Sequence, residues 1–255
     1  MTRMLTALVG AVVATCSIAS VAHAGLSECL ALPNYLALSD ALKAATKPAG
    51  GPSNGGLDFN MWGAIVDVDG TVCAVAFTGK GYTDQWLGSR VISAQKANTA
   101  NAFSLNGFAL STANLYAATQ PGGSLFGLQA SNPVDTAVAY AGDERRFGMR
   151  NDPMVGKRIG GVNVFGGGLA LYKNGRKIGG LGVSGDTSCA DHNVAWRVRK
   201  SLGLDKVPGG VSANKDDGII YDIASGVSKG GFGHPTCGGK EADIAKDIGA
   251  GGIVQ

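Results

Sequence analysis

Residues 61–79, MWGAIVDVDGTVCAVAFTG, contain two runs of β-branched and small apolar residues separated by Asp69-Gly70. An Asp-Gly pair between two such runs is a strong signal for a β-hairpin, because the tight turn needs residues that tolerate positive φ. A second hairpin is predicted over residues 168–185, GLALYKNGRKIGGLGVSG, with its turn at Asn174-Gly175. The two hairpins together predict an antiparallel sheet.

Helical segments flank these hairpins. The spacing of apolar residues predicts helices over residues 33–46, 85–104, 111–119 (a shorter one) and 189–202. Thr187 or Ser188 is expected to cap the start of the last helix, and Gly203 to end it. The order hairpin, helix, insertion, hairpin, helix predicts a small α+β domain with helices packed on the sheet.

The chain divides into four expected parts. Residues 1–24 form a signal peptide, residues 25–56 an N-terminal helix and linker, and residues 57–204 the main domain with a glycine- and proline-rich insertion at 120–160. Residues 205–255 form a glycine-rich C-terminal extension with one strand-like run, GIIYDI at 218–223. Glycine makes up 41 of the 255 residues, which predicts many tight turns and close backbone approaches.

The first residues have the three parts of a secretory signal: Arg3, an apolar run over 5–21, and Ala22-His23-Ala24 before the expected cleavage point. An uncleaved anchor is the alternative, because the apolar run approaches the roughly 18 residues of a membrane span. No later segment is expected to span a membrane after cleavage. The sequence therefore predicts a periplasmic or secreted protein.

Charge excludes one class of partner. The chain carries 22 Lys and Arg against 19 Asp and Glu, a net charge of +3, without a basic run or interleaved aromatic residues. This pattern argues against nucleic acid as a partner.

Four cysteines follow the expected cleavage point: Cys29, Cys73, Cys189 and Cys237. An even number in an oxidising compartment favours disulfides, and the sequence permits three pairings. The favoured pairing joins Cys189 to Cys237, which would tether the extension, and leaves Cys29 to pair with Cys73. The alternative is a metal site of Cys189, His192, His234 and Cys237, since each pair of soft ligands is spaced by three residues.

The helix predicted over 189–202 has two contrasting faces. One face carries Ala190, Val194, Val198 and Leu202 and should pack on the sheet; the other carries Cys189, His192, Trp196 and Arg199. A face with a cysteine, a histidine and a tryptophan is expected to be covered, and the C-terminal extension is the segment available to cover it.

The helix predicted over 85–104 carries candidate ligand-binding residues. Its main stripe contains Ile92, Lys96, Thr99, Ala100 and Phe103. The Lys96 ammonium either reaches outward to solvent while its stem packs, or lies at the mouth of a pocket opposite an anionic ligand group. Arg90 lies off this stripe and is predicted to be solvated or at an interface.

A hydrolase is disfavoured. Residues 182–186, GVSGD, match the nucleophile elbow G-x-S-x-G except at Asp186, and the nearness of Ser184, Asp186 and His192 in sequence does not make a triad.

Four stretches, in the same order along residues 57–202, resemble the GlcG/HbpS haem-binding family: AIVDVDGTVCAVAFTG, SRVISAQKANTANAFS, PGGSLFGL, and GGLALYKNGRKIGGLGVSGDTSCADHNVAWRV. The resemblance implies a profilin-like α+β domain that self-associates and binds haem or a related small molecule. Lys96, with Thr99 beside it, is the residue that it places at the ligand. The chain departs from the family at Asp186, where a glycine is usual, and in its insertion and extension.

Three functions are weighed. The favoured one is an exported, non-catalytic haem-binding or haem-sequestering protein with a link to haem or iron sensing. Its ligand-binding candidates are Lys96, Thr99, Phe103, His192 and His234. His192 and His234 are included because imidazole is the commonest type of haem ligand. The alternatives are an enzyme that degrades haem or acts on a small carboxylate, with His192 or Asp186 moving protons, and a structural domain that assembles or binds a partner.

Overall fold

The protein is described from a computed structural model that covers residues 29–49 and 53–253. The expected signal peptide, residues 1–24, lies outside the described residues. A four-stranded sheet forms the centre, with strands β1 (Trp62–Asp67), β2 (Val72–Phe77), β3 (Gly168–Lys173) and β4 (Arg176–Ser184). The strands lie in the order β2-β1-β4-β3, and each neighbouring pair is antiparallel. The predicted α+β class is confirmed.

Both predicted hairpins are present. The second turns at Asn174 and Gly175, which have φ of 52° and 73°, the left-handed values that a tight two-residue turn requires. In the first, Gly70 has φ of 86°, and the Asp67 carboxylate accepts hydrogen bonds from the Asp69 and Thr71 N–H groups. The turn residues therefore set the registers of both strand pairs.

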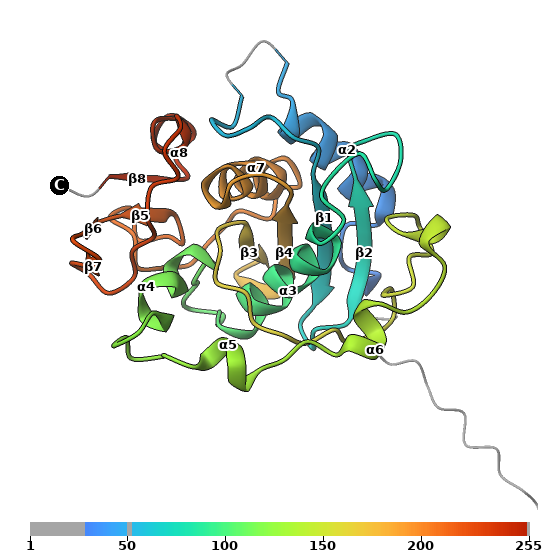
Figure 1. The fold of residues 1–255 in the computed structure, drawn as a ribbon, viewed down its shortest axis with the longest axis horizontal. Helices are drawn as coiled ribbons and strands as arrows, with labels where there is room; N and C mark the ends of the chain where they lie inside the picture. Colours follow the sequence, from blue (N-terminus) through green and yellow to red (C-terminus); the bar gives the residue numbers. More distant parts are fainter. Residues whose placement is uncertain (1–28, 50–52, 254–255) are drawn as a thin grey trace, which may run out of the picture.

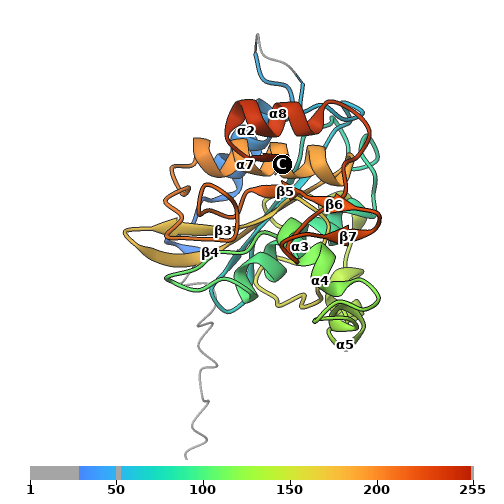
Figure 2. The same ribbon diagram turned by 90° about the vertical axis from the view of Figure 1, so that its left-hand side faces the viewer.

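Helices cover both faces of the sheet (Figures 1 and 2). α3 (Ser89–Ala102) lies on one face, chiefly against β4 and β1, and α2 (Tyr35–Thr46) and α7 (Ser188–Ser201) lie on the other. Two apolar clusters fill these layers. One contains Leu38, Leu42, Ile65, Leu181 and Val198, and the other contains Trp62, Val66, Val75, Ala94 and Ala97.

Glycines in β4 let α3 approach the sheet closely. A Cβ added at Gly182 would lie 1.9 Å from the Ser93 carbonyl oxygen, and one added at Gly180 would lie 2.2 Å from that of Ala97. These distances are far inside van der Waals contact, so any larger residue at either position would push α3 away. The close approach brings the middle of α3 next to the end of β4, where the candidate site lies.

The insertion is mostly irregular, with short turns of helix. The helix predicted over 111–119 is divided into η1 (Ala113–Leu115) and α4 (Tyr116–Thr119), followed by α5 (Leu128–Ser131), α6 (Thr136–Ala139) and η2 (Glu144–Arg146).

The sequence analysis predicted that Arg90 is solvated or lies at an interface, and this prediction is wrong. Its side chain is 2% exposed and forms a two-bond ion pair with Asp152, while its guanidinium lies 3.8 Å from the centre of the Phe147 ring. It also donates to the Ala139 carbonyl at 3.0 Å. Arg90 therefore attaches the insertion to α3.

The C-terminal extension is more ordered than its glycine content suggested. It contains β5 (Ile219–Tyr221), β6 (Ile223–Ala224), β7 (Val227–Ser228), α8 (Glu241–Ile248) and β8 (Gly251–Ile253). β5 and β8 pair in parallel, and β6 and β7 pair antiparallel. The sequence analysis expected only one strand here and missed α8, a helix of 8 residues between glycines that packs on α7.

This extension covers the second face of α7, as predicted. Thr187 caps the helix by accepting a hydrogen bond from the Ala190 N–H, and Gly203 follows its end with φ of 67°. Cys189 packs with Ile219 and Ala245 of the extension in a separate apolar cluster.

Among the described residues, no helix has the length and apolar character needed to cross a bilayer.

Candidate functional site

A cavity of about 290 Å³ lies between α3, the end of β4 and the start of α7. Its walls are mainly apolar, and its lining residues come from three stretches of the chain: 86–96, 165 and 184–191. They are Trp86, Ser89, Ile92, Lys96, Phe165, Ser184, Asp186, Ser188 and Asp191. Of the ligand-binding candidates from the sequence, only Lys96 lines this cavity.

Lys96 is paired with Asp191 at the inner wall. The ammonium lies 2.6 Å from Asp191 Oδ2 and donates a second hydrogen bond to the Val183 carbonyl at 3.1 Å. Both side chains are at most 4% exposed. Lys96 lines a pocket, as one of the two sequence interpretations expected, but its ammonium does not reach solvent, and the carboxylate opposite it belongs to this same chain.

Burial acts against both charges of the pair. It raises the pKa of Asp191 to about 6 and lowers the pKa of Lys96, while their mutual attraction opposes both shifts. Asp191 Oδ1 also accepts the Asp186 N–H at 2.9 Å. The pair is therefore the polar floor of an otherwise apolar hollow.

Asp186 has a structural role. Its carboxylate accepts N–H groups from Leu57 and Phe59 at 2.8 and 3.1 Å, which ties the segment before β1 to the turn between β4 and α7. The proton-transfer role considered for Asp186 in the sequence analysis is therefore not what its contacts favour. A glycine at this position would lack these bonds.

Thr99 and Phe103 do not line the cavity. The Thr99 hydroxyl donates to the Gln95 carbonyl and accepts the Asn163 N–H. Phe103 lies seven residues after Lys96, about 10 Å further along the helix axis, and packs against an apolar cluster that includes Val164. The sequence analysis placed Lys96, Thr99 and Phe103 on one stripe of the helix. That stripe extends two turns beyond Lys96, whereas the cavity ends at Lys96.

His192 faces the extension and does not line the cavity. It is fully buried, its Nε2–H donates to the Ala250 carbonyl at 3.2 Å, and its ring stacks on Trp196 with centroids 6.0 Å apart. Burial lowers its pKa to about 3. Its Nδ1 has no hydrogen-bond partner within the described part of the chain.

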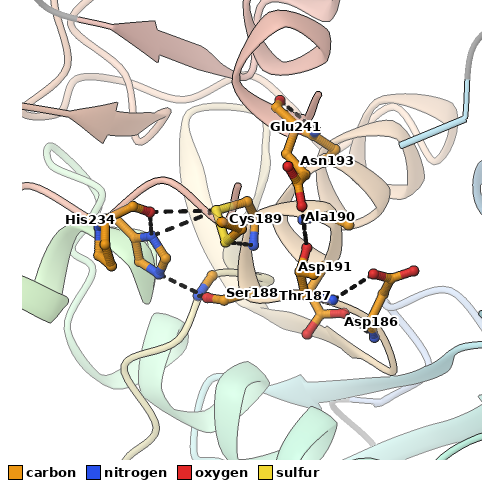
Figure 3. Close-up of a disulfide and its surroundings, with 12 residues drawn as sticks. Asp186, Thr187, Ser188, Cys189, Ala190, Asp191, Asn193, His234 and Glu241 are labelled. Atoms are coloured by element: carbon orange, nitrogen blue, oxygen red, sulfur yellow. Dashed lines mark hydrogen bonds between the residues drawn. A yellow bond between two sulfur atoms is a disulfide. The ribbon is translucent and has the colours of Figure 1, made fainter. Parts of the chain in front are cut away.

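His234 lies beside Ser188, one of the residues that line the cavity (Figure 3). Its Nε2 is 2.8 Å from the Ser188 hydroxyl and its Nδ1 is 2.7 Å from the Pro235 carbonyl oxygen. Its ring packs against that of Tyr116, with centroids 5.1 Å apart. Burial lowers the pKa of His234 to about 4, so its imidazole is neutral at physiological pH.

The structure contains the disulfides Cys189–Cys237 and Cys29–Cys73, with Cα atoms 6.1 and 5.4 Å apart. Ligand atoms of Cys189, His234 and Cys237 lie within 4.8 Å of one another, but His192 is not part of this group. A zinc site needs thiolates, and the two sulfurs are bonded to each other. The four-residue metal site considered from the sequence is therefore not assembled.

Aromatic side chains line the cavity or contact its lining. Trp86 and Phe165 line it and are 52% and 44% exposed, and the Phe59 ring meets Trp86 edge-on at 5.2 Å. We call these three residues the apolar rim. The sequence analysis missed it, because the rim residues precede regular elements and share no periodicity.

A larger hollow of about 760 Å³ lies between α4 and the extension. Its walls contain many glycines and the side chains of Tyr116, Gln120, Ile223 and Val227. The Tyr116 side chain lines this hollow and packs against the His234 ring. Ser188, which lines the 290 Å³ cavity, is hydrogen bonded to the same histidine.

Known proteins resemble this chain at the level of family and fold. A sequence model of the family described as "Haem degrading protein HbpS-like" matches residues 53–199. No curated protein sequence gives a match.

Several solved structures are similar. PduOC in complex with haem is 24% identical, with a TM-score of 0.44, over 66% of this chain and 91% of that chain. Protein ORFY of Klebsiella pneumoniae is 20% identical, with a TM-score of 0.43, over 67% and 90% of the two chains. HbpS is 16% identical, with a TM-score of 0.39, over 67% and 90%.

Proposed function

Because this chain belongs to the HbpS-like family of haem-degrading proteins, whose model spans residues 53–199, we propose that it is an exported haem-binding protein that sequesters haem without turning it over. The observation that carries this proposal within the structure is the apolar rim around the 290 Å³ cavity. The haem macrocycle is flat and largely apolar, with its two propionates at one edge, and exposed aromatic side chains around a hollow supply the surface on which the apolar part of the ring is retained.

The residues present fit an apolar ligand better than an anionic one. Trp86, Ile92 and Phe165 supply apolar wall, while Lys96 is already neutralised by Asp191. The cavity, at about 290 Å³, is at the small end of ligand pockets, so the rim is expected to supply much of the contact. Bound haem supplies iron redox chemistry, and the chain supplies the apolar surface that retains it.

Among the described residues, neither histidine lines this cavity, so neither is placed to coordinate haem iron there. His192 and His234 are buried and already hydrogen bonded. We therefore expect the cavity to retain haem through apolar contacts rather than through an imidazole ligand to the iron.

The direct test is a titration of the purified chain with haem, followed by the Soret band. We expect a saturable spectral change at micromolar haem, and the same change in His192→Gln, which alters a histidine outside the cavity. A chain that gives no spectral change at micromolar haem does not have the proposed function.

Haem degradation is the second candidate, because the family description names it. Addition of a reductant to the haem-loaded protein separates the two. Sequestration predicts a Soret band that persists, whereas degradation predicts its time-dependent loss with release of iron.

Export and self-association complete the proposal. The apolar run over 5–21 followed by Ala22-His23-Ala24 supports export, and exposed apolar side chains outside the rim, such as Leu105 and Phe126, support contact between copies of the chain. Sequencing of the mature N-terminus should begin at Gly25, and mass measurement in solution should exceed that of one chain. A link to haem or iron sensing would require a partner, which co-purification from the native compartment can identify.

A further inference from the structure

Ser188 and His234 form a hydrogen-bonded pair at the cavity wall. Ser188 is the first residue of α7 and lines the 290 Å³ cavity, and its hydroxyl lies 2.8 Å from Nε2 of His234 in the extension (Figure 3). The two residues are 46 positions apart and are brought together by the tail that the Cys189–Cys237 disulfide fixes. None of the functions weighed above uses this pair.

The direction of the hydrogen bond follows from the second nitrogen. His234 Nδ1 is 2.7 Å from the Pro235 carbonyl oxygen, which can only accept, so Nδ1 carries the hydrogen. The buried ring is neutral, so Nε2 has a lone pair and no hydrogen. The Ser188 hydroxyl must therefore donate to Nε2. This is the arrangement in which an imidazole can take a proton from a serine, with a third group holding the ring.

Two further contacts prepare the serine oxygen for negative charge. Ser188 Oγ accepts the Gly166 N–H at 2.7 Å, which stabilises charge on that oxygen. α7 has 14 residues and begins at Ser188, so the positive end of its dipole points toward the same place. In the described part of the chain no hydrogen bond uses the Ser188 N–H, which leaves it free for an oxyanion.

We propose that Ser188 is the nucleophile and His234 the proton acceptor of a hydrolytic site for small, neutral esters with an apolar acyl group. Ser188 Oγ attacks the ester carbonyl carbon as its proton moves to His234 Nε2. The carbon–oxygen bond to the alcohol then breaks, and the proton passes from Nε2 to the departing alcohol. Water attacks the acyl-serine, gives one proton to Nε2, and the acid leaves as Ser188 regains its proton.

The cavity decides the substrate class. Its walls are Trp86, Ile92 and Phe165, and its volume of about 290 Å³ admits a short alkyl or single-ring acyl group. A carboxylate-bearing substrate would find no free counter-charge, because Asp191 already pairs with Lys96. Neutral esters fit both the size and the polarity of this hollow.

The test uses the full exported chain with its disulfides intact. p-Nitrophenyl acetate reports turnover, and an alkyl fluorophosphonate reports covalent capture, read by the mass of the intact protein and of its peptides. We expect one label per chain, on Ser188, and hydrolysis at least tenfold faster than in Ser188→Ala. Ser201→Ala, at the other end of α7 and outside the cavity, is the matched control and should label and turn over like the parent.

The pH profile separates this site from an exposed histidine or lysine that reacts with the ester. Titratable groups around His234 are Tyr116 from α4, Lys96 from α3 and His192 from α7. The Lys96 charge lowers the pKa of His234 further than burial alone. Acylation should therefore stay constant from pH 8 to 5 and decline only toward about pH 4, whereas an exposed imidazole declines below about 6.5.

His234→Gln should lower the acylation rate about a hundredfold, the size expected for a lost general base. If His234→Gln does not fold, Ser188→Ala by itself still tests the proposal. Absence of labelling in the parent chain, or labelling that persists in Ser188→Ala, would overturn the proposal. Haem binding by Ser188→Ala is measured in parallel, so that failure of the ester site and failure of haem binding are read separately.

Discussion

Arg199 of α7 and Asp217 of the extension form a two-bond ion pair that is almost completely buried. The nitrogen–oxygen distances are 2.6 and 2.7 Å, and neither side chain is more than 1% exposed. Arg199 also donates to the Ala170 carbonyl and lies over the Trp196 ring. The pair links the main domain and the extension in a place where water cannot substitute for either partner.

Asp217→Ala should therefore be strongly destabilising. It leaves the Arg199 guanidinium buried without a counter-charge, which costs roughly 3–5 kcal/mol when one partner of a buried pair is removed. Urea denaturation at pH 7 measures the loss. Arg145→Ala breaks a pair that is exposed, with Arg145 82% accessible, and should give no measurable change. Equal stabilities of the two variants would contradict this account.

The Cys189–Cys237 disulfide should stabilise the attachment of the extension. It closes a loop with a sequence separation of 48, which in the chain-entropy model contributes about 4 kcal/mol. Replacement of both cysteines by alanine should lower the free energy of unfolding by up to this amount and expose the extension to protease.

The matched control replaces Cys29 and Cys73, whose disulfide closes a loop of similar separation, 44, at the other end of the domain. Limited proteolysis should then cut the N-terminal segment and spare the extension. Cleavage within residues 205–250 in both variants would show that the Cys189–Cys237 bond does not hold the extension specifically.

The sequence predicted the local features of the fold. Asn174-Gly175 specified a turn through its own φ values, and Thr187 specified a helix start through its own hydroxyl. The two faces of α7 were also predictable, since helical periodicity follows from a few residues. From the unusual face with Cys189 and His192 it followed that the extension must cover α7, which the structure confirms.

The sequence did not reveal the partners of buried charges. Arg90 pairs with a residue 62 positions away, and Lys96 with Asp191, 95 positions away. No local pattern marks such a pair, because only the packing of the insertion on α3 brings Asp152 to Arg90, and only the close packing of α3 on β4 brings Lys96 to Asp191. For the same reason the cavity walls, with Trp86 and Phe165 from separate loops, could not be deduced from a single helical stripe.

His192 should make the protein less stable in acid. Its pKa in the folded protein is lowered by burial to about 3, below the ordinary value of 6.5, so the unfolded chain takes up the proton first as pH falls. The stabilising contribution is complete above about pH 6.5 and is lost as pH falls toward 3, at about 1.4 kcal/mol per pH unit.

His192→Gln removes this titration and keeps an amide donor for the Ala250 carbonyl. Between pH 6 and 4 its unfolding free energy should fall less steeply than that of the parent, by about 1.4 kcal/mol per pH unit. Urea titrations at three pH values measure both slopes. Parallel slopes for parent and variant would mean that His192 is not held neutral by the fold.

Lys96→Met should destabilise the protein more at pH 8 than at pH 5. Without the ammonium, the Asp191 carboxylate is buried alone, and its pKa, already raised to about 6, rises further. At pH 8 the folded protein must bear the buried charge or take up a proton, at a cost of about 3–5 kcal/mol, whereas at pH 5, about one unit above the ordinary aspartate pKa, protonation costs only about 1–2 kcal/mol.

Lys96→Met combined with Asp191→Asn is the control, since it removes both charges and should recover much of the stability at pH 8. Chemical denaturation of the parent, of Lys96→Met, of Asp191→Asn and of the double variant at both pH values completes a double-mutant cycle. A loss that is the same at pH 5 and pH 8 would argue that Lys96 stabilises through its packed stem rather than through its charge.

Trp86→Ala should weaken haem binding while leaving the fold intact. The indole lines the cavity, is 52% exposed, and contacts the Phe59 ring at its edge, so its removal takes apolar surface from the rim without opening the core. Loss of one aromatic contact of this kind costs about 1–3 kcal/mol, which raises the dissociation constant roughly fivefold to 150-fold. Tyr140→Ala changes an aromatic residue of the insertion that is 69% exposed and does not line the cavity, and it should bind haem like the parent. Soret titrations of the parent and the two variants decide between the rim and a different haem site. Both substitutions remove one exposed aromatic ring, so only a loss specific to Trp86→Ala supports the rim. If the two variants lose the same affinity, or if neither loses any, haem binds elsewhere on the chain.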